Sequence, residues 1–417
     1  MTESTPTTSS VAIDQQDERL ISSSGVGGAI RAFVSRVRNG DLGSLPVVVG
    51  LIIIWVVFQI LNSDFLSSNN LVNLALQCAA TGMIAVGVVL VLLLAQIDLS
   101  VGSVSGLAAA ILGVGMTRLG WPVSVAIGVA LAAGIAIGLL YAFLFVRFGV
   151  PSFVITLAGL LGFLGLQLWI LGPNGSINIP FESWVVQFAQ QSFLPPIVAY
   201  ALAAIAAIAY GLSGYLSARR RKAHGLSFTS PIETIVKSVL LFVVLAAAAW
   251  YLNTDRGVGV SFLLFIVVVI VMNYALRRTK WGRSVYAVGG NVEAARRAGI
   301  NVNRIYISVF ALSSLFAALG GLLAAARLTS ASLSSGGGDV NLNAIAAAVI
   351  GGTSLFGGRG SAFSALLGIL VIQSISSGLT LLSLGSPERY MITGAVLLLA
   401  VIIDSLSRRS RASHGRA

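Results

Sequence analysis

Long apolar runs, separated by short polar stretches, occupy the chain from residue 46 to residue 406. A helix needs about 20 mainly apolar residues to cross a bilayer, and somewhat fewer where protein buries its ends. The runs therefore predict an all-α polytopic membrane protein with about twelve transmembrane helices, an even number that puts both termini on one side. Counts of eleven or fourteen fit the same pattern. The predicted spans are 46–61, 71–97, 101–117, 121–146, 152–171, 194–216, 235–252, 260–276, 305–326, 342–356, 362–382 and 390–406.

Glycine-rich polar stretches interrupt two of these runs. Residues 96–103 read QIDLSVGS, and residues 351–361 read GGTSLFGGRGS. At membrane depth, irregular backbone is tolerated only where protein buries it or where it lines a water-filled cavity. We therefore expect both stretches to be flexible points of a pathway through the membrane, with Asp98, Ser100, Gly357 and Gly358 as candidate residues. Their positions in the two halves of the chain suggest an inverted repeat, a common plan in membrane transporters.

Asp98 is the most informative single residue, because isolated acids within spans are rare and usually face a cavity or a partner. One interpretation makes it a gate or pathway residue. The other makes it a capping acid at a helix break near the inner surface, where Ser100 and backbone amides would satisfy it.

The polar stretch 277–304, between two predicted spans, carries the signals of a short helix. Asn291 is placed to cap this helix and Gly299 to end it, with Glu293 in the first turn. Asn291 and Gly299 are residue types that pair or relieve the free backbone groups at the two helix ends, and an acid in the first turn interacts favourably with the helix dipole. Ala294 and Ala298, four residues apart, leave one side smooth enough to fit a partner's groove. We expect a coupling helix, through which a cytoplasmic motor pushes on a membrane pore. An ordinary basic loop is the alternative.

Charge fixes the predicted orientation. Charged residues make up 10% and hydrophobic residues 56% of the 417 residues, against roughly 25% charged residues in a soluble domain. With the N-terminus in the cytoplasm, only Arg118, Arg256, Arg327 and Arg389 of the 26 Lys and Arg residues lie outside. Such a bias fits the positive-inside rule, so the net charge of +12 needs no nucleic acid to explain it. The single cysteine, Cys78, excludes an internal disulfide.

Several stretches resemble the ribose- and xylose-type sugar-permease family of bacterial ABC importers. Glu293-Ala294-Ala295 followed by Gly299 resembles the EAA loop of importer permeases, although the I-x-L-P ending found in some of them is missing. IDLSVG at 97–102 and GGTSLFGGRG at 351–360 resemble the family's two breaks, and the extra spans at 194–252 resemble its xylose-type subgroup. The resemblance implies a ten-helix permease core with two inserted helices, coupled through Asn291, Glu293, Ala294, Ala295, Ala298 and Gly299 to an ATPase.

The stretch before the tenth predicted span departs from this family. Related permeases often carry an acidic pair there, where this chain has Asn341 and Asn343. Amides can hydrogen-bond a sugar hydroxyl, but they cannot accept a proton as carboxylates do. The two residues are therefore either pathway residues for a neutral cargo or caps of the helix that follows.

The energy source is expected to lie outside the chain. None of the three lysines follows a glycine, so there is no phosphate-binding G-K-[S/T] loop. His224 and His414 lie far apart and without nearby acids, so we expect no enzymatic site, metal or cofactor, with ATP bound by a partner subunit. The prediction is a permease subunit for a neutral monosaccharide such as xylose. The alternatives are an ion-coupled secondary sugar carrier and a branched-chain amino-acid ABC permease.

The resemblance also implies the assembly and its location. It predicts a pair of permease copies, a cytoplasmic ABC ATPase and an extracytoplasmic sugar-binding protein in a bacterial cytoplasmic membrane, surrounded by lipid. Along the chain we expect a disordered cytoplasmic tail at 1–45, which lacks the apolar core of a signal peptide. The transmembrane domain follows at 46–406, with an inserted helix pair at 194–252, the coupling loop at 277–304, and a basic cytoplasmic tail at 407–417.

Overall fold

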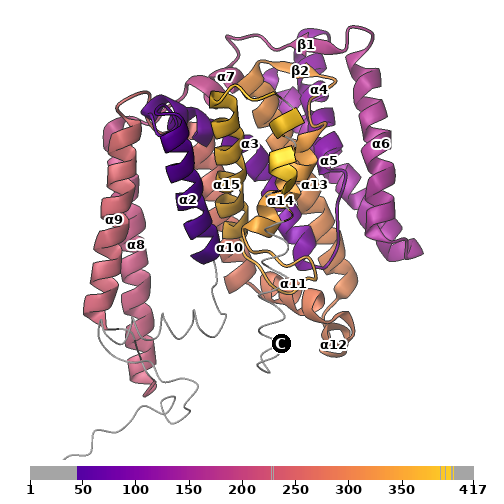
Figure 1. Ribbon diagram of the computed structural model, residues 1–417. Helices are drawn as coiled ribbons and strands as arrows, with labels where there is room; N and C mark the ends of the chain where they lie inside the picture. The colour runs from indigo at the N-terminus through magenta and orange to yellow at the C-terminus, as the bar shows by residue number, and fades with distance from the viewer. Residues whose placement is uncertain are drawn as a thin grey trace, which may run out of the picture. The chain divides into compact units, whose positions relative to one another are not determined.

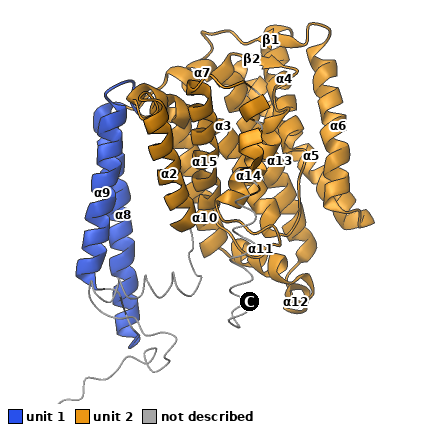
Figure 2. Ribbon diagram, viewed as in Figure 1, with its two compact units in different colours: residues 1–42, 195–257, 407–417 blue, residues 43–194, 258–406 orange. Residues whose placement is uncertain are grey.

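The computed structural model describes residues 45–226, 228, 230–385, 387–389, 391–395 and 398. The predicted tail at 407–417, all but the last residue of the tail at 1–45 and most of the predicted span 390–406 lie outside these residues. The chain divides into two compact units (Figure 2). Unit 1 holds residues 1–42, 195–257 and 407–417, and unit 2 holds residues 43–194 and 258–406.

The described part of unit 2 consists mainly of helices (Figure 1). They are α2 (Leu45–Leu61), α3 (Ser68–Leu93), α4 (Val101–Thr117), α5 (Val123–Phe148), α6 (Ser152–Leu171), α7 (Trp184–Val186), the π-helical turn η3 (Gln187–Gln191), α10 (Val260–Arg278), α11 (Lys280–Gly290), α12 (Val292–Arg297), α13 (Val302–Leu328), α14 (Asp339–Ile350) and α15 (Ala362–Leu381). Across the described residues of both units, eight helices are long and apolar enough to cross a membrane, and α2, α4 and α14 are shorter apolar helices. The predicted all-α polytopic membrane fold is confirmed.

Two predicted spans match helices to the residue, and the other spans that have a described helix differ from it at one end or both. The spans 101–117 and 152–171 coincide with α4 and α6. However, α3 ends at Leu93 rather than at residue 97, because Ala95 takes a left-handed conformation (φ 57°) and turns the chain. Helix α14 covers Asp339–Ile350 rather than 342–356, because Gly352 follows with φ 101°, which no helix continues through.

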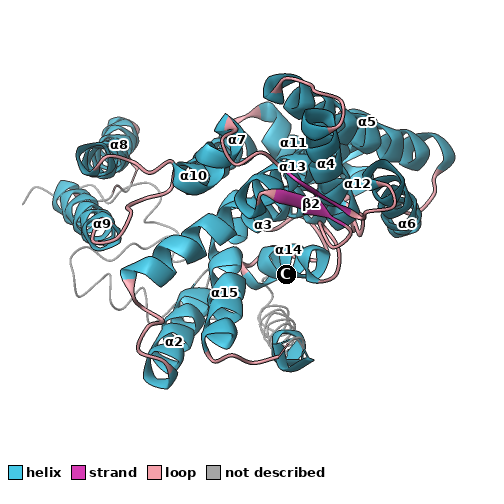
Figure 3. Cartoon of the chain, turned by 90° about the horizontal axis from the view of Figure 1, so that it is seen from above, coloured by secondary structure: helices cyan, strands magenta, loops and turns pink. Residues whose placement is uncertain are grey.

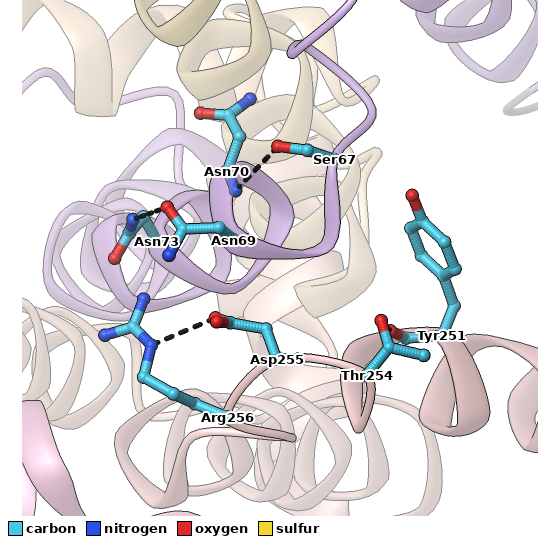
Figure 4. Close-up of polar contacts among 8 residues, drawn as sticks. All are labelled: Ser67, Asn69, Asn70, Asn73, Tyr251, Thr254, Asp255 and Arg256. Carbon is cyan, nitrogen blue, oxygen red and sulfur yellow. Dashed lines mark hydrogen bonds and ion pairs between the residues drawn. The ribbon is translucent and has the colours of Figure 1, made fainter.

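Helices α3 and α13 lie at the centre of unit 2, with α4, α5, α10, α14 and α15 around them (Figure 3). Helix α3 is apolar on all sides and is buried along most of its length, as expected for a core helix. Small residues allow the two central helices to approach closely: a Cβ added at Gly87 would clash with the backbone oxygen of Ser313, and one at Gly320 with that of Ala80. At the start of α3, the Ser67 hydroxyl accepts a hydrogen bond from the backbone nitrogen of Asn70 over 3.3 Å (Figure 4).

A small sheet closes one end of unit 2, opposite the end that carries α11 and α12 (Figure 1). Strand β1 (Ser176–Asn178) pairs antiparallel with β2 (Ser330–Ser332), with Ile177 opposite Ala331. The sheet therefore joins the segment after α6 to the segment between α13 and α14. The sequence did not predict this sheet, because strands of three residues are too short to show an alternation of apolar and polar residues.

Unit 1 is a pair of antiparallel helices in its described part, α8 (Pro196–Ala223) and α9 (Pro231–Leu252) (Figure 2). Their contact is built from small residues: Ala203 and Ala207 are buried, and a Cβ added at Gly211 or Gly214 would press on Ser238 or Thr234. Most other side chains of the pair are exposed apolar groups, as suits helices whose solvent is lipid. Just after α9, the Arg256 guanidinium pairs with Asp255 over 3.0 Å (Figure 4).

Candidate functional site

The non-helical segment between α3 and α4 buries a carboxylate. Asp98 is only 3% exposed, and its Oδ1 accepts hydrogen bonds from the Ser100 backbone nitrogen (2.9 Å) and the Ser100 hydroxyl (2.7 Å). Its Oδ2 accepts from the hydroxyl of Ser313 on α13 over 3.4 Å. Among the described residues, no cation lies within salt-bridge distance of this carboxylate. Asp98 thus accepts hydrogen bonds just before α4, whose N-cap is Ser100, and its role stays a prediction.

Side chains from two other helices hold the backbone of the same segment. Two hydroxyls of α6 accept hydrogen bonds from backbone nitrogens of this segment. The Ser152 hydroxyl accepts from Ile97 over 3.4 Å, and the Thr156 hydroxyl accepts from Leu99 over 3.1 Å. On the opposite side, the Asn341 amide nitrogen of α14 donates to the Leu99 backbone oxygen over 2.6 Å. Unwound backbone in a low-dielectric interior needs such partners, and α6 and α14 supply them here.

The loop between β2 and α14 runs along α4 towards this break. The Gln167 amide nitrogen, from α6, donates to the backbone oxygens of Ser332 and Ser335, both over 2.9 Å. Further along, Gly336 lies so close to α4 that a Cβ there would clash with the Gly102 oxygen. The amide oxygens of Gln167 and Asn341 are buried and have no hydrogen-bond partner in the protein. Two unused acceptors therefore lie beside the first half of α4.

Helix α12 has the local structure expected from its sequence. The Asn291 side chain caps it by accepting from the Ala294 backbone nitrogen over 2.9 Å, and Glu293 pairs with Arg296 over 2.9 Å. Gly299 follows with φ 79°, the left-handed conformation that ends many helices. Ala295 is buried against the core, whereas Ala294 and Ala298 are exposed. The two alanines on which the expected smooth side depends therefore lie on the surface, and their coupling role stays a prediction.

Helix α11 connects α12 to both breaks. The Gly358 backbone nitrogen donates to the Leu93 backbone oxygen over 2.9 Å, so the two interrupted segments touch. Gly289 fits into this contact, since a Cβ there would clash with both the Leu93 oxygen and the Gly358 nitrogen. The Tyr286 hydroxyl donates to the Gly360 oxygen over 2.8 Å. The end of α11 therefore packs against the end of α3 and against the second break at Gly358 and Gly360.

Helix α11 is also fixed to the centre of unit 2. The Trp281 ring nitrogen donates to the Ser308 hydroxyl of α13 over 2.8 Å. Val285 and Val288 are buried in the main core, together with Ala295 of α12. The exposed side of this end of the unit is basic, with Glu293 as its one acid within 277–304. Its exposed cations are Arg277, Arg278, Lys280, Arg283, Arg296, Arg297 and Arg304.

Comparison with known proteins places this architecture in a family. Residues 70–401 match the family described as "Branched-chain amino acid transport system / permease component". The chain belongs to this permease family. It is a transport subunit, and the matched region includes both breaks and the helices α11 and α12.

The permease has well-covered relatives among sugar permeases. It is 38% identical over 345 residues to the xylose transport system permease protein XylH of Escherichia coli strain K12, covering 83% of this chain and 87% of that protein. To XylH of Haemophilus influenzae it is 35% identical over 375 residues, covering 90% and 99%. To the ribose import permease protein RbsC of Escherichia coli strain K12 it is 32% identical over 364 residues, covering 86% and 92%. No solved structure matches the permease. The resemblance to the ribose- and xylose-type family is confirmed.

The fold brings several candidate residues of the permease together and leaves one apart. Asp98, Ser100 and Asn341 meet at the first break, and Gly357 and Gly358 contact the end of α3 beside α11. Asn343 instead donates to Asp339 of its own helix over 3.4 Å. The capping interpretation of the two asparagines is wrong, because both lie inside α14, whose N-cap is Gly338. Their pathway role stays a prediction.

Two features of the site were missed in the sequence. Helix α11 was taken as loop, although Thr279 is a good capping residue and its hydroxyl accepts from the Gly282 nitrogen over 3.1 Å. Its buried positions Gly282, Val285 and Val288 recur at the three-residue spacing of a helix face. Gln167 was also missed, although a lone amide within an apolar span is itself a signal of a polar partner.

Proposed function

We propose that this permease is the membrane-spanning subunit of an ABC importer for a neutral monosaccharide, xylose or a similar sugar. The observation that carries the proposal is the 38% identity to a xylose permease over 83% of the chain. The proposed assembly contains two permease copies, a cytoplasmic ATPase and an extracytoplasmic sugar-binding protein in a bacterial cytoplasmic membrane. The missing G-K-[S/T] loop supports a separate ATPase.

The polar groups beside the breaks suit an uncharged cargo with many hydroxyls. Side-chain amides and hydroxyls are common there, including Gln167, Asn341, Ser100 and Ser313. The buried carboxylate of Asp98 already accepts hydrogen bonds from serines. A charged cargo needs a fixed opposite charge to offset its desolvation. A proton-coupled carrier needs a buried group that exchanges protons with a partner, and no described cation pairs with Asp98.

Helices α11 and α12 are proposed to carry the stroke of the ATPase. The exposed side of α12, with Ala294 and Ala298, would be held by the motor, and Asn291, Glu293, Ala295 and Gly299 define its shape. Because the end of α11 is wedged between Leu93 and Gly358, movement of this pair would reach both broken helices at once. In this mechanism the breaks near Asp98 and Gly357 are the points where the pathway flexes.

Uptake by reconstituted vesicles tests the cargo and the energy source. Vesicles holding the permease with its ATPase and binding protein should accumulate labelled xylose when ATP is inside, and should not accumulate labelled leucine. Leucine accumulation would favour the branched-chain amino-acid transport in the family's description. Vesicles holding the permease alone should show no uphill sugar uptake under a proton or sodium gradient. Such uptake would identify a secondary carrier and overturn the proposal.

The orientation can be tested by cysteine labelling. The single native cysteine, Cys78, is fully buried, so an introduced cysteine gives the only readily labelled thiol in the described chain. Ala298→Cys on α12 should react with a membrane-impermeant reagent only from the cytoplasm. Asn174→Cys, exposed beside the β1–β2 sheet, should react only from outside. Labelling of Ala298→Cys from outside would reverse the topology and remove the coupling role.

A further inference from the structure

Four consecutive cations form an exposed ring at one end of α8. Arg219, Arg220, Arg221 and Lys222 are all exposed in the last turns of this helix. The sequence from 195 to 230 contains no Asp or Glu. In α9 the single acid, Glu233, is already paired with Lys237 over 2.5 Å. Within the described residues of the helix pair, Arg219 and Arg220 therefore carry a positive charge that no acid of the pair neutralises.

The length of α8 places this ring at the membrane surface. The 28 residues of the helix extend about 42 Å at 1.5 Å per residue, whereas the hydrocarbon core of a bilayer is about 30 Å thick. A helix that enters the hydrocarbon near Pro196 therefore leaves it about 20 residues later, near Tyr215. The four cations follow directly, at the depth of the lipid headgroups.

Within the described residues of unit 1, helix α9 covers only part of the circumference of this ring. Successive residues of a helix are about 100° apart, so four in a row surround its end. Helix α9 covers only the side of α8 that carries Ala207, Gly211 and Gly214. On the other sides, exposed Leu212 and Tyr215 lie about two turns and one turn before the cations along the helix. A molecule bound along α8 would therefore contact cations near the end of the helix and apolar side chains closer to the membrane centre.

We propose that this end of α8 binds anionic phospholipid, with Arg219 and Arg220 holding the phosphate of the headgroup and the acyl chains lying along the exposed apolar sides. Guanidinium groups match phosphate oxygens through paired hydrogen bonds, and basic clusters just beyond a span attract anionic headgroups. A lipid can pair its anionic headgroup with the cations and pack its acyl chains against the apolar side chains, whereas a soluble acidic protein would pair only with the cations. The inference rests on the membrane orientation of the proposed function, and it is independent of the cargo.

Native mass spectrometry of the purified full-length permease tests the inference. Binding of phosphatidylglycerol is compared with that of phosphatidylcholine of the same acyl chains, for the wild type, Arg219→Gln/Arg220→Gln, and Arg277→Gln/Arg278→Gln. The last variant is the matched control, because it removes two exposed arginines from the end of α10. The wild type should prefer phosphatidylglycerol. The α8 variant should lose about 25-fold in apparent affinity for it, taking roughly fivefold per cation, and the control should lose less than about threefold.

Three results would overturn the inference. An equal loss of phosphatidylglycerol affinity in both variants would show that the lipid responds to overall surface charge and not to a site on α8. Unchanged phosphatidylglycerol binding by the α8 variant, together with weaker binding of the purified ATPase subunit, would assign the ring to a protein partner. Displacement of the lipid by millimolar glycerol phosphate would reduce the site to one for free phosphate. Because these measurements need neither sugar nor ATP, a failure of the uptake experiments would leave their outcome unaffected.

Discussion

The Asn341 amide donates its hydrogen bond to the backbone oxygen of Leu99 over 2.6 Å, across 242 residues of sequence. The bond joins the first turn of α14 to the break that precedes α4. The carbonyl of Leu99 lies in the segment that also holds Asp98, so one side chain links the first break to the start of α14, the helix that ends where the second break begins. The Gly358–Leu93 hydrogen bond links the two breaks directly, beside α11. The two breaks are therefore parts of one connected site.

Removing the Asn341 amide should loosen this connection. Asn341→Ala leaves the Leu99 oxygen without its side-chain partner, so we expect the free energy of unfolding to fall by about 1–2 kcal/mol. Thermal unfolding in detergent measures the change. Asn343→Ala is the matched control, because Asn343 is half-buried and makes only a 3.4 Å contact within its own helix. Equal effects of the two substitutions would contradict the assigned role of Asn341.

The tight packing at the end of α11 predicts that substitutions of the adjacent residues Gly289 and Gly290 have different effects on coupling. A Cβ at Gly289 would clash with backbone atoms of Leu93 and Gly358, whereas one at Gly290 would meet nothing within 4 Å. Gly289→Ala should force α11 away from the breaks, at a cost of about 1–3 kcal/mol. In the reconstituted importer, sugar uptake per ATP hydrolysed should fall for Gly289→Ala and stay at the wild-type value for Gly290→Ala. A normal ratio for Gly289→Ala would show that the stroke does not pass through this contact.

The Tyr286 hydroxyl predicts a pH-dependent stability difference. Tyr286→Phe removes its hydrogen bond to the Gly360 oxygen and should lower the free energy of unfolding by about 1 kcal/mol at neutral pH. Burial raises the pKa of the Tyr286 hydroxyl, and the charge of nearby Arg277 opposes this shift only in part. The folded state therefore holds its proton more tightly than the unfolded chain, whose tyrosine ionises near pH 10.

The stabilisation from Tyr286 is complete below that pH and is lost as the pH rises through it. The difference in stability between the wild type and Tyr286→Phe should thus be constant from pH 6 to pH 8 and shrink above about pH 10. Chemical unfolding curves at a series of pH values measure it. A difference that grows with pH would mean that the hydroxyl is ionised in the folded protein.

The sequence predicted the presence of the apolar helices and of α12, because both depend on local chemistry. A run of apolar residues must be a helix in lipid, and Asn291 and Gly299 mark the ends of α12 through their own backbone preferences. The sequence could not predict contacts between residues that lie far apart along the chain. Nothing near Asn341 in the sequence indicates that its amide reaches Leu99, and nothing near Gly289 indicates that Leu93 and Gly358 enclose it. Such contacts arise only when the helices pack.

The exposed side of α12 supplies the most direct test of coupling. Ala294→Trp places a large side chain on the surface proposed to enter the motor, where overpacking of about 1–3 kcal/mol corresponds to roughly 5- to 150-fold weaker binding. Because Ala294 is exposed, membrane insertion and thermal stability of the permease alone should stay unchanged. Ala294→Ser, which stays small, is the matched control and should bind the ATPase normally. Affinity of the purified ATPase for permease in nanodiscs measures the effect. Wild-type affinity of Ala294→Trp would exclude this side of α12 from the interface, whereas loss of affinity with intact folding would place the motor on it.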